Sequence, residues 1–553
     1  MNLLYFLLEN FFMEEKYSVL FLIALSLILT FISTNLLSSI VADVIQSIQK
    51  KQFALGFESF KQYAGISAVF LVLLYLYKIF QNRLLTKLTQ WLKQELLKII
   101  LSANNENIQQ INFIEFITPI TRIPSSCYIL FYDVVSVIIP TITFLLGISA
   151  FFLMKEVSLG LFFIMSNIFI IVYLWFFWEY LLREKSVYEI KINENEKIIV
   201  DILNNIDKVI YRGQSSNEIK SFQAKTDEGI EIGTNFLSIS TQHIMILNVF
   251  VLIIFLMVMW YLIKLRREEK IDTQFFITLL TIMLMYRERM SQMVGNLADY
   301  LEFIGKLNYI IDQFDEMLGN KADINEILNR KYEKVAIPFS NISFHNVSFR
   351  YSDKHPYVFE NLSIEVHTDN KIIGIIGESG KGKSSFVKLL LRLYDPTSGD
   401  IFIDGVNITT IDPDFIRENI TYVNQNSKLF DKKIIDNLMY GCSDMEECHS
   451  NLSDIMSYSK MQKLFGNMDI ENKMAGSLGE NLSGGQRQIA NVISGLINPS
   501  PILILDEPTN ALDPELKEEL LGIIQKYRNY KKCILIITHD RDVKSLFDET
   551  INI

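Results

Sequence analysis

The chain has 553 residues, enough for two or more domains, and its formal net charge is −11. An acidic chain is a poor general nucleic-acid binder, because such binding rests on basic contacts to phosphates, so we expect no nucleic acid among its partners. Hydrophobic residues make up 50% of the chain. They gather in long apolar runs before about residue 300, whereas the part after about residue 340 has the composition of a soluble domain.

The amino-terminal segment MNLLYFLLENFFMEEK contains an apolar stretch that Glu9 interrupts. It has no basic region, and no small-residue cleavage site follows, so it is not typical of a signal peptide. Leucines and phenylalanines on one side of a helix instead favour an amphipathic helix that lies on a membrane surface.

Six apolar stretches follow, at about residues 17–41, 63–80, 128–154, 157–180, 243–263 and 275–293. A helix needs about 20 apolar residues to cross a bilayer core. Six such stretches joined by charged segments are typical of a membrane domain, which we place at residues 1–310, rather than of buried helices in a soluble core. The charged stretches 81–127 and 181–242 keep a helical apolar period. We therefore expect long helices that continue beyond the bilayer and turn near residues 104–116 and 204–216.

The sixth apolar stretch runs into Arg287, Glu288 and Arg289. Charge at membrane depth is costly unless it faces a wet cavity or a partner. One interpretation is that these side chains line a path for a transported substrate. The other is that the membrane ends at Tyr286 and that they lie at its surface. Methionines, which suit helix packing or an adaptable binding surface, lie beside them at Met283, Met285 and Met290.

A charged connector at residues 311–340 leads into apolar runs that are typical of strands. The run KIIGIIG then meets a segment that fits G-x-x-x-x-G-K-[ST], between a predicted strand and a predicted helix. We expect its backbone amides to cradle the phosphates of ATP, Lys383 to reach the β- and γ-phosphates, and Ser384 to bind Mg²⁺. The predicted ATP-binding residues of this loop are Gly377, Glu378, Ser379, Gly380, Lys381, Gly382, Lys383, Ser384 and Ser385.

A pair of carboxylates occurs in the segment PILILDEPTNALD. Residues 502–505 predict a buried strand, and Asp506 at its end is placed to hold Mg²⁺, directly or through water. Glu507 follows and is placed to polarise an attacking water, so we predict that it is catalytic.

The segment LSGGQ precedes this pair and consists of Leu482, Ser483, Gly484, Gly485 and Gln486. With this signature motif, the chain resembles ATP-binding cassette (ABC) transporters of the exporter type, and the resemblance spans the whole chain. It implies a membrane all-α six-helix domain with long cytoplasmic helix extensions. An α/β P-loop nucleotide-binding domain at residues 341–553 follows.

The resemblance also implies roles for single residues. Tyr351 matches the aromatic residue that stacks on adenine. Gln425 matches a residue that contacts Mg²⁺ and senses the membrane domain, and His539 matches a catalytic histidine that contacts the γ-phosphate. The D-loop, which crosses to the opposite subunit in this family, corresponds to Ala511, Leu512 and Asp513.

In such transporters two cassettes face head to tail, and each ATP lies between one P-loop and the signature of the other cassette. One cassette and six spans therefore imply a half-transporter that dimerises. A second copy is the leading expectation, and a different half-transporter is the alternative. The implied location is the cell membrane, crossed several times, with the cassette on the cytoplasmic side.

The implied activity is ATP hydrolysis coupled to export by alternating access. An amphipathic peptide of the bacteriocin type is the first hypothesis for the substrate, with a lipid or a drug as alternatives. An ATP-gated channel or sensor and an importer with an exporter-shaped fold are rival hypotheses. The chain departs from the family at Ser477, where exporters often have a glutamate, and at Ile489, where an arginine is usual.

The four cysteines are scattered, at Cys127, Cys442, Cys448 and Cys533. Their spacing fits neither a disulfide framework nor a zinc site, so we expect neither.

Overall fold

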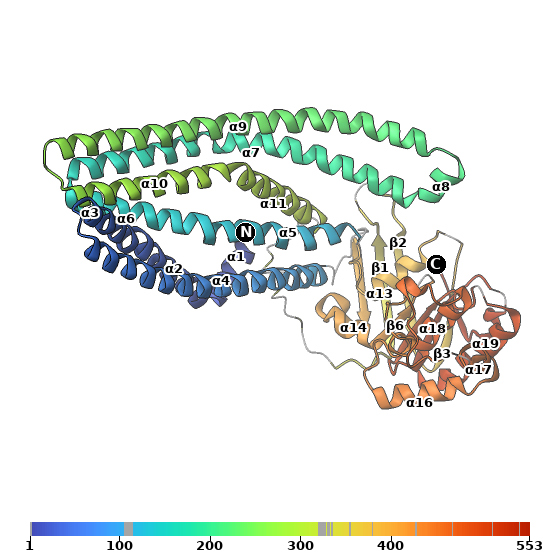
Figure 1. Cartoon of the computed structure of the whole chain (residues 1–553). Helices are drawn as coiled ribbons and strands as arrows, with labels where there is room; N and C mark the ends of the chain where they lie inside the picture. Colours follow the sequence, from blue (N-terminus) through green and yellow to red (C-terminus); the bar gives the residue numbers. More distant parts are fainter. Residues whose placement is uncertain are drawn as a thin grey trace. The chain divides into compact units, whose positions relative to one another are not determined.

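The computed structural model describes residues 3–103, 114–318, 324, 328, 332, 336–352, 355–378, 380–425, 428–466, 468–510, 512–540 and 542–553. The chain divides into two compact units, whose elements are labelled in Figure 1. The first contains Met1–Ile100 and Ile111–Ile324, and we call it the helical unit. The second contains Asn325–Ile553, and we call it the cassette.

The described part of the helical unit is built from α-helices with two π-helical segments, η1 and η2. In chain order these elements are α1 (Leu3–Glu14), α2 (Lys16–Phe31), η1 (Ile32–Leu37), α3 (Ser38–Gln49), α4 (Phe53–Ala103), α5 (Ile114–Asp133), η2 (Val134–Ile138), α6 (Ile139–Lys155), α7 (Val157–Asn204), α8 (Ile206–Tyr211), α9 (Ser215–Arg267), α10 (Thr273–Gly295) and α11 (Leu297–Met317). The predicted amino-terminal helix is present as α1, and it buries Leu3, Leu7 and Phe11 along one side.

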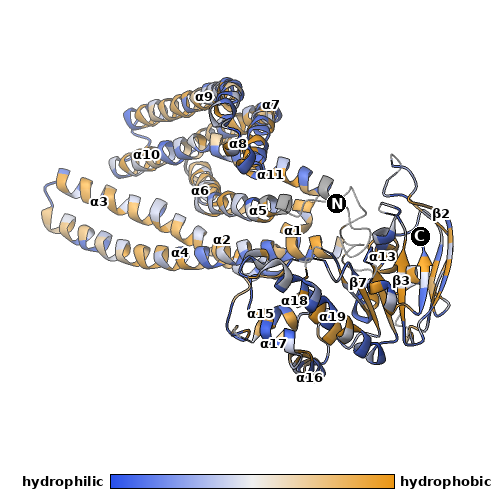
Figure 2. Cartoon of the chain, turned by 90° about the vertical axis from the view of Figure 1, so that its right-hand side faces the viewer, coloured by the Kyte–Doolittle hydropathy of each residue, from blue (hydrophilic) through white to orange (hydrophobic). Residues whose placement is uncertain are grey.

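Among the described residues, five helical stretches are long and apolar enough to cross a membrane: Lys16–Gln49, Phe53–Ala103, Pro119–Met154, Val157–Asn204 and Ser215–Arg267. They contain the first five predicted spans, and the sixth lies in α10. Hydrophobic residues, orange in Figure 2, run along these helices. Many of their large apolar side chains point outward; Trp175 is 77% exposed and Trp260 is 66% exposed. Such exposure is costly in water and is typical of side chains that face lipid.

The helices α7 and α9 are much longer than a bilayer is thick. They have 48 and 53 residues, so at about 1.5 Å per residue each is more than twice the ~30 Å of a bilayer core. They lie side by side and are joined through α8, where a turn near residues 204–216 is predicted (Figure 1). The other predicted turn, near residues 104–116, falls mainly on residues outside the described ones.

The core of the helical unit lies among α6, α7, α9 and α10. Phe163 and Tyr286 pack edge to face there, with ring centroids 5.1 Å apart, and the Tyr286 hydroxyl donates to Asn167 Oδ1 at 3.1 Å. Met283 and Met290 are buried in this core, so these two of the four methionines of α10 serve helix packing.

The cassette contains two sheets. An antiparallel sheet has the strand order β2-β1-β4-β5, and a parallel sheet has the order β6-β7-β8-β3-β9. The strands are β1 (Asn341–Phe349), β2 (Phe359–His367), β3 (Lys371–Ile376), β4 (Ser398–Ile403), β5 (Val406–Asn407), β6 (Ile420–Val423), β7 (Ile502–Asp506), β8 (Cys533–Ile537) and β9 (Glu549–Asn552).

Helices surround these sheets. They are α13 (Lys383–Leu390), η3 (Ile408–Thr410), α14 (Pro413–Asn419), α15 (Ile434–Leu438), α16 (Met445–Met456), α17 (Ser459–Phe465), η4 (Ser477–Gly479), α18 (Gly484–Ile497), α19 (Pro514–Tyr527), η5 (Arg528–Tyr530) and η6 (Val543–Leu546), where η marks short 3₁₀ turns in the cassette.

The parallel sheet explains why the predicted site residues meet. All five residues of β7 and all five of β8 are buried, as in a parallel strand covered on both faces, and β3 and β7 are orange in Figure 2. In this sheet β7, β8 and β3 are neighbours. Because parallel strands end at the same edge, the loops that follow these three strands lie together there, where open α/β sheets bind ligands.

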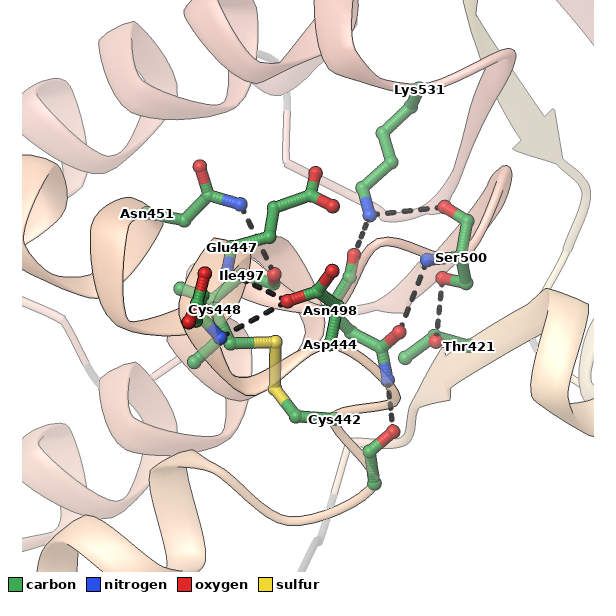
Figure 3. Close-up of a disulfide and its surroundings, with 12 residues drawn as sticks. Thr421, Cys442, Asp444, Glu447, Cys448, Asn451, Ile497, Asn498, Ser500 and Lys531 are labelled. Atoms are coloured by element: carbon green, nitrogen blue, oxygen red, sulfur yellow. Dashed lines mark hydrogen bonds between the residues drawn. A yellow bond between two sulfur atoms is a disulfide. The ribbon is translucent and has the colours of Figure 1, made fainter.

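One prediction about the cysteines is wrong: Cys442 and Cys448 form a disulfide, with their Cα atoms 6.5 Å apart (Figure 3). The turn at Gly441, with φ of 82°, leads into this short segment. Asp444 then caps α16 by accepting hydrogen bonds from the backbone N–H groups of residues 446 and 447. The cap fixes the direction of the helix that carries Cys448, and spacing alone does not reveal this local geometry.

Polar side chains surround the disulfide (Figure 3). Asn498 donates to the carbonyl of Gly441 at 2.9 Å, and the buried ammonium of Lys531 donates to the carbonyls of Asn498 and Ser500. Burial lowers the pKa of Lys531 from 10.5 to about 8, because the charged form loses its hydration.

Candidate functional site

The glycine-rich loop between β3 and α13 requires glycine at two positions. Gly380 and Gly382 have φ angles of 82° and 98°, in the left-handed region that side chains rarely adopt. A Cβ on Gly382 would also lie 2.5 Å from Val358 Cγ1. The backbone of the loop is therefore free of side chains where a phosphate would approach. Ser379, predicted as part of this loop, lies outside the described residues.

Lys383 is the first residue of α13, and only 8% of it is exposed. Its ammonium donates to the carbonyls of Gly377 and Glu378 at 2.9 and 3.0 Å and lies 3.4 Å from His539 Nε2. The cation is thus held inside its own loop, next to the predicted histidine. Phosphate oxygens would replace these carbonyls as its acceptors.

The carboxylate of Asp506 lies at the end of β7 and is buried, with 7% of the residue exposed. Burial raises the pKa of Asp506; the hydrogen bond from Tyr422 opposes this rise, and the charge of Glu507 adds to it. Tyr422 on β6 donates to Asp506 Oδ2 at 3.0 Å. Among the described residues, no cation lies within salt-bridge range of Asp506. Its oxygens, together with the exposed hydroxyl of Ser384, are the hard donors that Mg²⁺ prefers, so the residues fit this metal.

Glu507 has a φ of 49°, which is unusual for a residue with a side chain. Its two carboxylate oxygens are held from one side. Oε1 accepts from the backbone N–H of His539 at 3.0 Å, and Oε2 accepts from the Thr538 hydroxyl at 3.0 Å. The imidazole Nε2 of His539 lies 4.0 Å from Oε1, and 58% of that side chain is exposed. The structure therefore brings Glu507, His539 and Lys383 together.

Tyr351 lies beside the start of α13. Its hydroxyl is 2.7 Å from Ser385 Oγ, the ammonium of Lys388 is 5.4 Å from its ring centroid, and its ring packs edge to face on Phe349. The predicted adenine-stacking residue thus adjoins the predicted phosphate loop.

The signature motif forms the start of α18. Ser483 is the N-cap: its hydroxyl accepts from Gln486 N at 3.2 Å, and Gln486 Oε1 accepts from Ser483 N at 2.9 Å. This reciprocal pair is a capping box, which fixes the helix start. Within the described residues, no hydrogen bond joins the signature motif to the glycine-rich loop. The same helix instead meets Glu507, because Gln488 donates to the Glu507 carbonyl at 3.1 Å.

Gln425 shares a cavity with Gly484 of the signature motif. It lines a cavity of about 570 Å³ together with Ser477, Gly484 and Asn510. Ser477, the departure from the family pattern, therefore faces the same space as Gln425. In the predicted D-loop, Asp513 caps α19 by accepting from Leu516 N at 2.9 Å, Leu512 packs against the core, and Ala511 lies outside the described residues.

The sequence interpretation missed two residues of this site, Tyr422 and Thr538. Tyr422 precedes the predicted Gln425 by three positions, and Thr538 directly precedes His539. Each donates a hydrogen bond to a predicted carboxylate. Their nearness to motif residues is a signal, but only the pairing of neighbouring strands shows which carboxylate each one meets.

The three charged residues of α10 lie in different surroundings. Glu288 and Arg289 line a cavity of about 380 Å³ in the helical unit, and Arg289 Nη1 donates to the carbonyl of Pro140 at 3.1 Å. Arg287 is exposed and is not among the residues that line this cavity; its guanidinium lies 6.0 Å from the ring centroid of Phe255 on α9.

Comparison with protein families gives a match at residues 359–510 to the family described as "ABC transporter". A second match, at residues 480–543, is to "AAA domain, putative AbiEii toxin, Type IV TA system". The first match contains the glycine-rich loop, the signature motif and both predicted carboxylates.

Among curated proteins, the chain is 34% identical over 201 residues to an ATP-dependent lipid A-core flippase of Pasteurella multocida, which covers 36% of this chain and 34% of that protein. It is 32% identical over 251 residues to the lactococcin-G-processing and transport ATP-binding protein of Lactococcus lactis, which covers 44% and 33%. The alpha-hemolysin translocation ATP-binding protein of Escherichia coli is 32% identical over 250 residues. The chain thus spans about a third of the length of these relatives.

Among solved structures, a bacterial Atm1-family ABC exporter with ATP bound has a TM-score of 0.76, with 19% sequence identity. The match covers 98% of this chain and 93% of the exporter. Residues 359–510 therefore match the ABC transporter family, and along nearly its whole length the chain has the fold of an ABC exporter.

Proposed function

We propose that this chain is a half-transporter that dimerises and exports an amphipathic compound across a membrane, driven by ATP binding and hydrolysis. The observation that carries the proposal is the group formed by Lys383, Glu507 and His539 at one edge of the parallel sheet. A cation for phosphate, a carboxylate for water and a histidine between them are the parts that ATP hydrolysis needs.

Four residues of the chain divide the work of hydrolysis. Lys383 exchanges the carbonyls of its own loop for the β- and γ-phosphates of ATP. The carboxylate of Glu507, oriented by Thr538 and by the backbone of His539, accepts a hydrogen bond from the attacking water and aims it at the γ-phosphorus. Asp506 and Ser384 would hold Mg²⁺, which neutralises charge on the phosphate oxygens when bound.

The signature motif completes the site of a second chain. Its serine and the amides that follow would contact the γ-phosphate held by the opposite cassette, and the D-loop would cross the same interface. All the predicted motifs are intact, which supports a homodimer with two working sites. The apolar exposure of the helices supports insertion in the cell membrane, with the cassette on the side where ATP is available.

The test is transport by the full chain reconstituted in liposomes with Mg²⁺-ATP. We expect ATP hydrolysis and uphill movement of a fluorescent amphipathic probe, both abolished in Glu507→Gln. Probe movement that continues in Glu507→Gln, or that runs only down its gradient, would overturn the proposal in favour of a channel. Movement toward the cassette side would indicate an importer.

A further inference from the structure

The cavity that Glu288 and Arg289 line lies between four parts of the helical unit. Its walls come from α2 with η1, from α4, from η2 with α6, and from α10, and its volume is about 380 Å³. One part of the lining is apolar and includes Leu29, Phe70 and Leu74. Other lining residues are polar or charged, so the cavity offers a ligand both apolar and polar surface.

Two cations line the cavity, Lys78 on α4 and Arg289 on α10, and both are half-buried. Lys78 Nζ donates to Gln81 Oε1 at 3.0 Å and to Ser136 Oγ at 3.3 Å. Arg289 donates to the carbonyl of Pro140, and its guanidinium lies 4.7 Å from the ring centroid of Phe144. All these partners are neutral. No carboxylate among the described residues lies within salt-bridge distance of either cation.

The helical unit does pair a buried cation elsewhere. Lys185 on α7 is almost fully buried, and its ammonium lies 2.8 Å from the carboxylate of Glu189. A buried cation without a counter-ion costs free energy. Lys78 and Arg289 have no such carboxylate partner among the described residues, which leaves the positive charge of this cavity available to a ligand.

A buried hydroxyl faces the same space. Ser26 on α2 is 2% exposed and lines the cavity, and its Oγ has no hydrogen-bond partner in the part of the chain that the structure describes. Buried polar atoms are nearly always satisfied, so an unsatisfied hydroxyl at a cavity wall indicates a missing acceptor or donor. A hydroxyl can donate a hydrogen bond to an anion, and so can the side chains of Lys78 and Arg289, which line the same cavity.

Both π-helical segments of the unit contribute to this wall, η1 through Ser33 and η2 through Ser136. Such segments are rare and concentrate at functional sites, because they displace backbone and side chains from the regular helical positions. Next to η2, the carbonyl of Pro140 orients Arg289. The π-helical segment η2 thus directly precedes the carbonyl that holds Arg289 at the cavity.

Glu288 is the one carboxylate among the lining residues, and it is exposed. With Lys78 and Arg289 it leaves a lining with one net positive charge. Exposure screens Glu288, whereas the two cations are half-buried and interact more strongly with a ligand.

We propose that this cavity binds the anionic head group, a carboxylate or a phosphate, of an amphipathic ligand whose tail lies on the apolar wall. The proposal deepens the proposed function by naming the chemical class of the exported compound, and it rests on that function. Lys78, Arg289 and Ser26 hold the head group, and none of them belongs to the nucleotide site.

The test measures equilibrium binding without ATP, so that it does not depend on hydrolysis or transport. The full chain is placed in nanodiscs of zwitterionic lipid, and binding of radiolabelled dodecyl phosphate is measured after subtraction of empty nanodiscs. We expect Lys78→Gln and Arg289→Gln each to weaken binding about tenfold, the loss typical of one charge-assisted hydrogen bond. Unchanged affinity in both variants would overturn the proposal.

The matched control is Arg287→Gln, which removes the same charge from the adjacent position of the same helix but outside the cavity lining. It should keep the affinity within about twofold, because an exposed charge is screened. Lys78→Arg and Arg289→Lys keep the charge and should retain most of the binding. If they lose it as fully as the glutamine variants do, the effect is one of packing and the proposal fails.

Competing ligands identify the chemistry. Unlabelled dodecanoate should displace the probe, whereas dodecyltrimethylammonium, with the same tail and opposite charge, should not. Equal displacement by both would show a purely apolar site and overturn the proposal. Displacement by inorganic phosphate at the same concentration would assign the site to a free anion instead of an amphiphile. Binding as expected in a chain that fails to transport would overturn only the proposed function.

Discussion

Charged groups are held differently in the nucleotide site and in the cavity of the helical unit. In the cassette, Lys383 and Glu507 already have hydrogen-bond partners from the protein, so their positions are fixed before any ligand binds. In the cavity, Lys78 and Arg289 likewise donate to neutral acceptors, but the hydroxyl of Ser26 has no hydrogen-bond partner among the described residues. The comparison suggests that the first site is organised for one reaction, while the second leaves its selectivity to the charge of the ligand.

The largest expected effect is the loss of ATP hydrolysis when the charge of Glu507 is removed. Glu507→Gln keeps one oxygen to accept from the backbone N–H of His539, and its amide N–H can donate to the Thr538 hydroxyl, but it removes the negative charge, so hydrolysis should fall by about a hundredfold or more. Steady-state ATPase activity of the reconstituted chain measures this fall. A fluorescent ATP analogue should still bind as in the wild type; loss of binding would mean that Glu507 shapes the pocket instead of activating water.

A smaller effect tests whether Tyr422 prepares Asp506 for the metal. Tyr422→Phe removes the hydrogen bond to Asp506 and should raise the Mg²⁺ concentration needed for half-maximal hydrolysis by about three- to tenfold. A Mg²⁺ titration of ATPase activity gives this value. Tyr440→Phe, at a tyrosine that is 59% exposed, is the matched control and should leave the titration unchanged; equal shifts in both variants would exclude a role for the Tyr422 contact.

The next prediction concerns the contribution of the disulfide to the stability of the cassette. Cys442→Ser opens a loop with a sequence separation of 6 residues and should destabilise the cassette by about 2 kcal/mol. The denaturant midpoint, followed by a probe in the cassette, reports this change. Dithiothreitol should lower the wild-type midpoint to that of the variant and leave the variant unchanged; a further fall in the variant would place the sensitivity at another site.

The smallest expected effect concerns Lys531. Its pKa of about 8 in the folded chain lies below 10.5, so the unfolded chain binds more protons between these values. Stability should therefore rise with pH above about 8, by at most ~1.4 kcal/mol per pH unit, and be lost as pH falls toward 8. The difference between wild type and Lys531→Met in denaturant midpoint, measured at pH 8 and pH 9, isolates this term. Parallel pH profiles would show that Lys531 keeps its proton throughout.

Most of what the sequence predicts about the nucleotide site comes from short motifs. The glycine pattern, the carboxylates after an apolar strand and the histidine after the next strand identify residues whose chemistry depends on short, local spacing. The contacts of Tyr422 and Thr538 depend on which strands are neighbours, and this information is spread over residues 420–538. Apolar stretches likewise predict the long helices, and the charge at residues 287–289 marks α10.

The cavity and the disulfide had no comparable signal. Lys78 meets Ser136 because α4 lies beside η2, and neither residue belongs to a recognisable pattern. Arg287 and Arg289 look equivalent in the sequence, yet one faces α9 and the other faces the cavity, since positions two apart on a helix point in different directions. Cys442 and Cys448 come together because of a turn and a helix cap, and the spacing of the cysteines in the sequence does not reveal this geometry.

The capping box at Ser483 has a consequence for how signature variants are interpreted. Removing the hydroxyl by Ser483→Ala would take away a helix cap worth about 1 kcal/mol in addition to any contact with a nucleotide. A loss of activity would therefore mix two causes, one within the chain and one across the proposed dimer. Ser483→Asp keeps a capping oxygen but would place negative charge toward the γ-phosphate in the proposed second site, so the pair of variants separates helix initiation from nucleotide recognition.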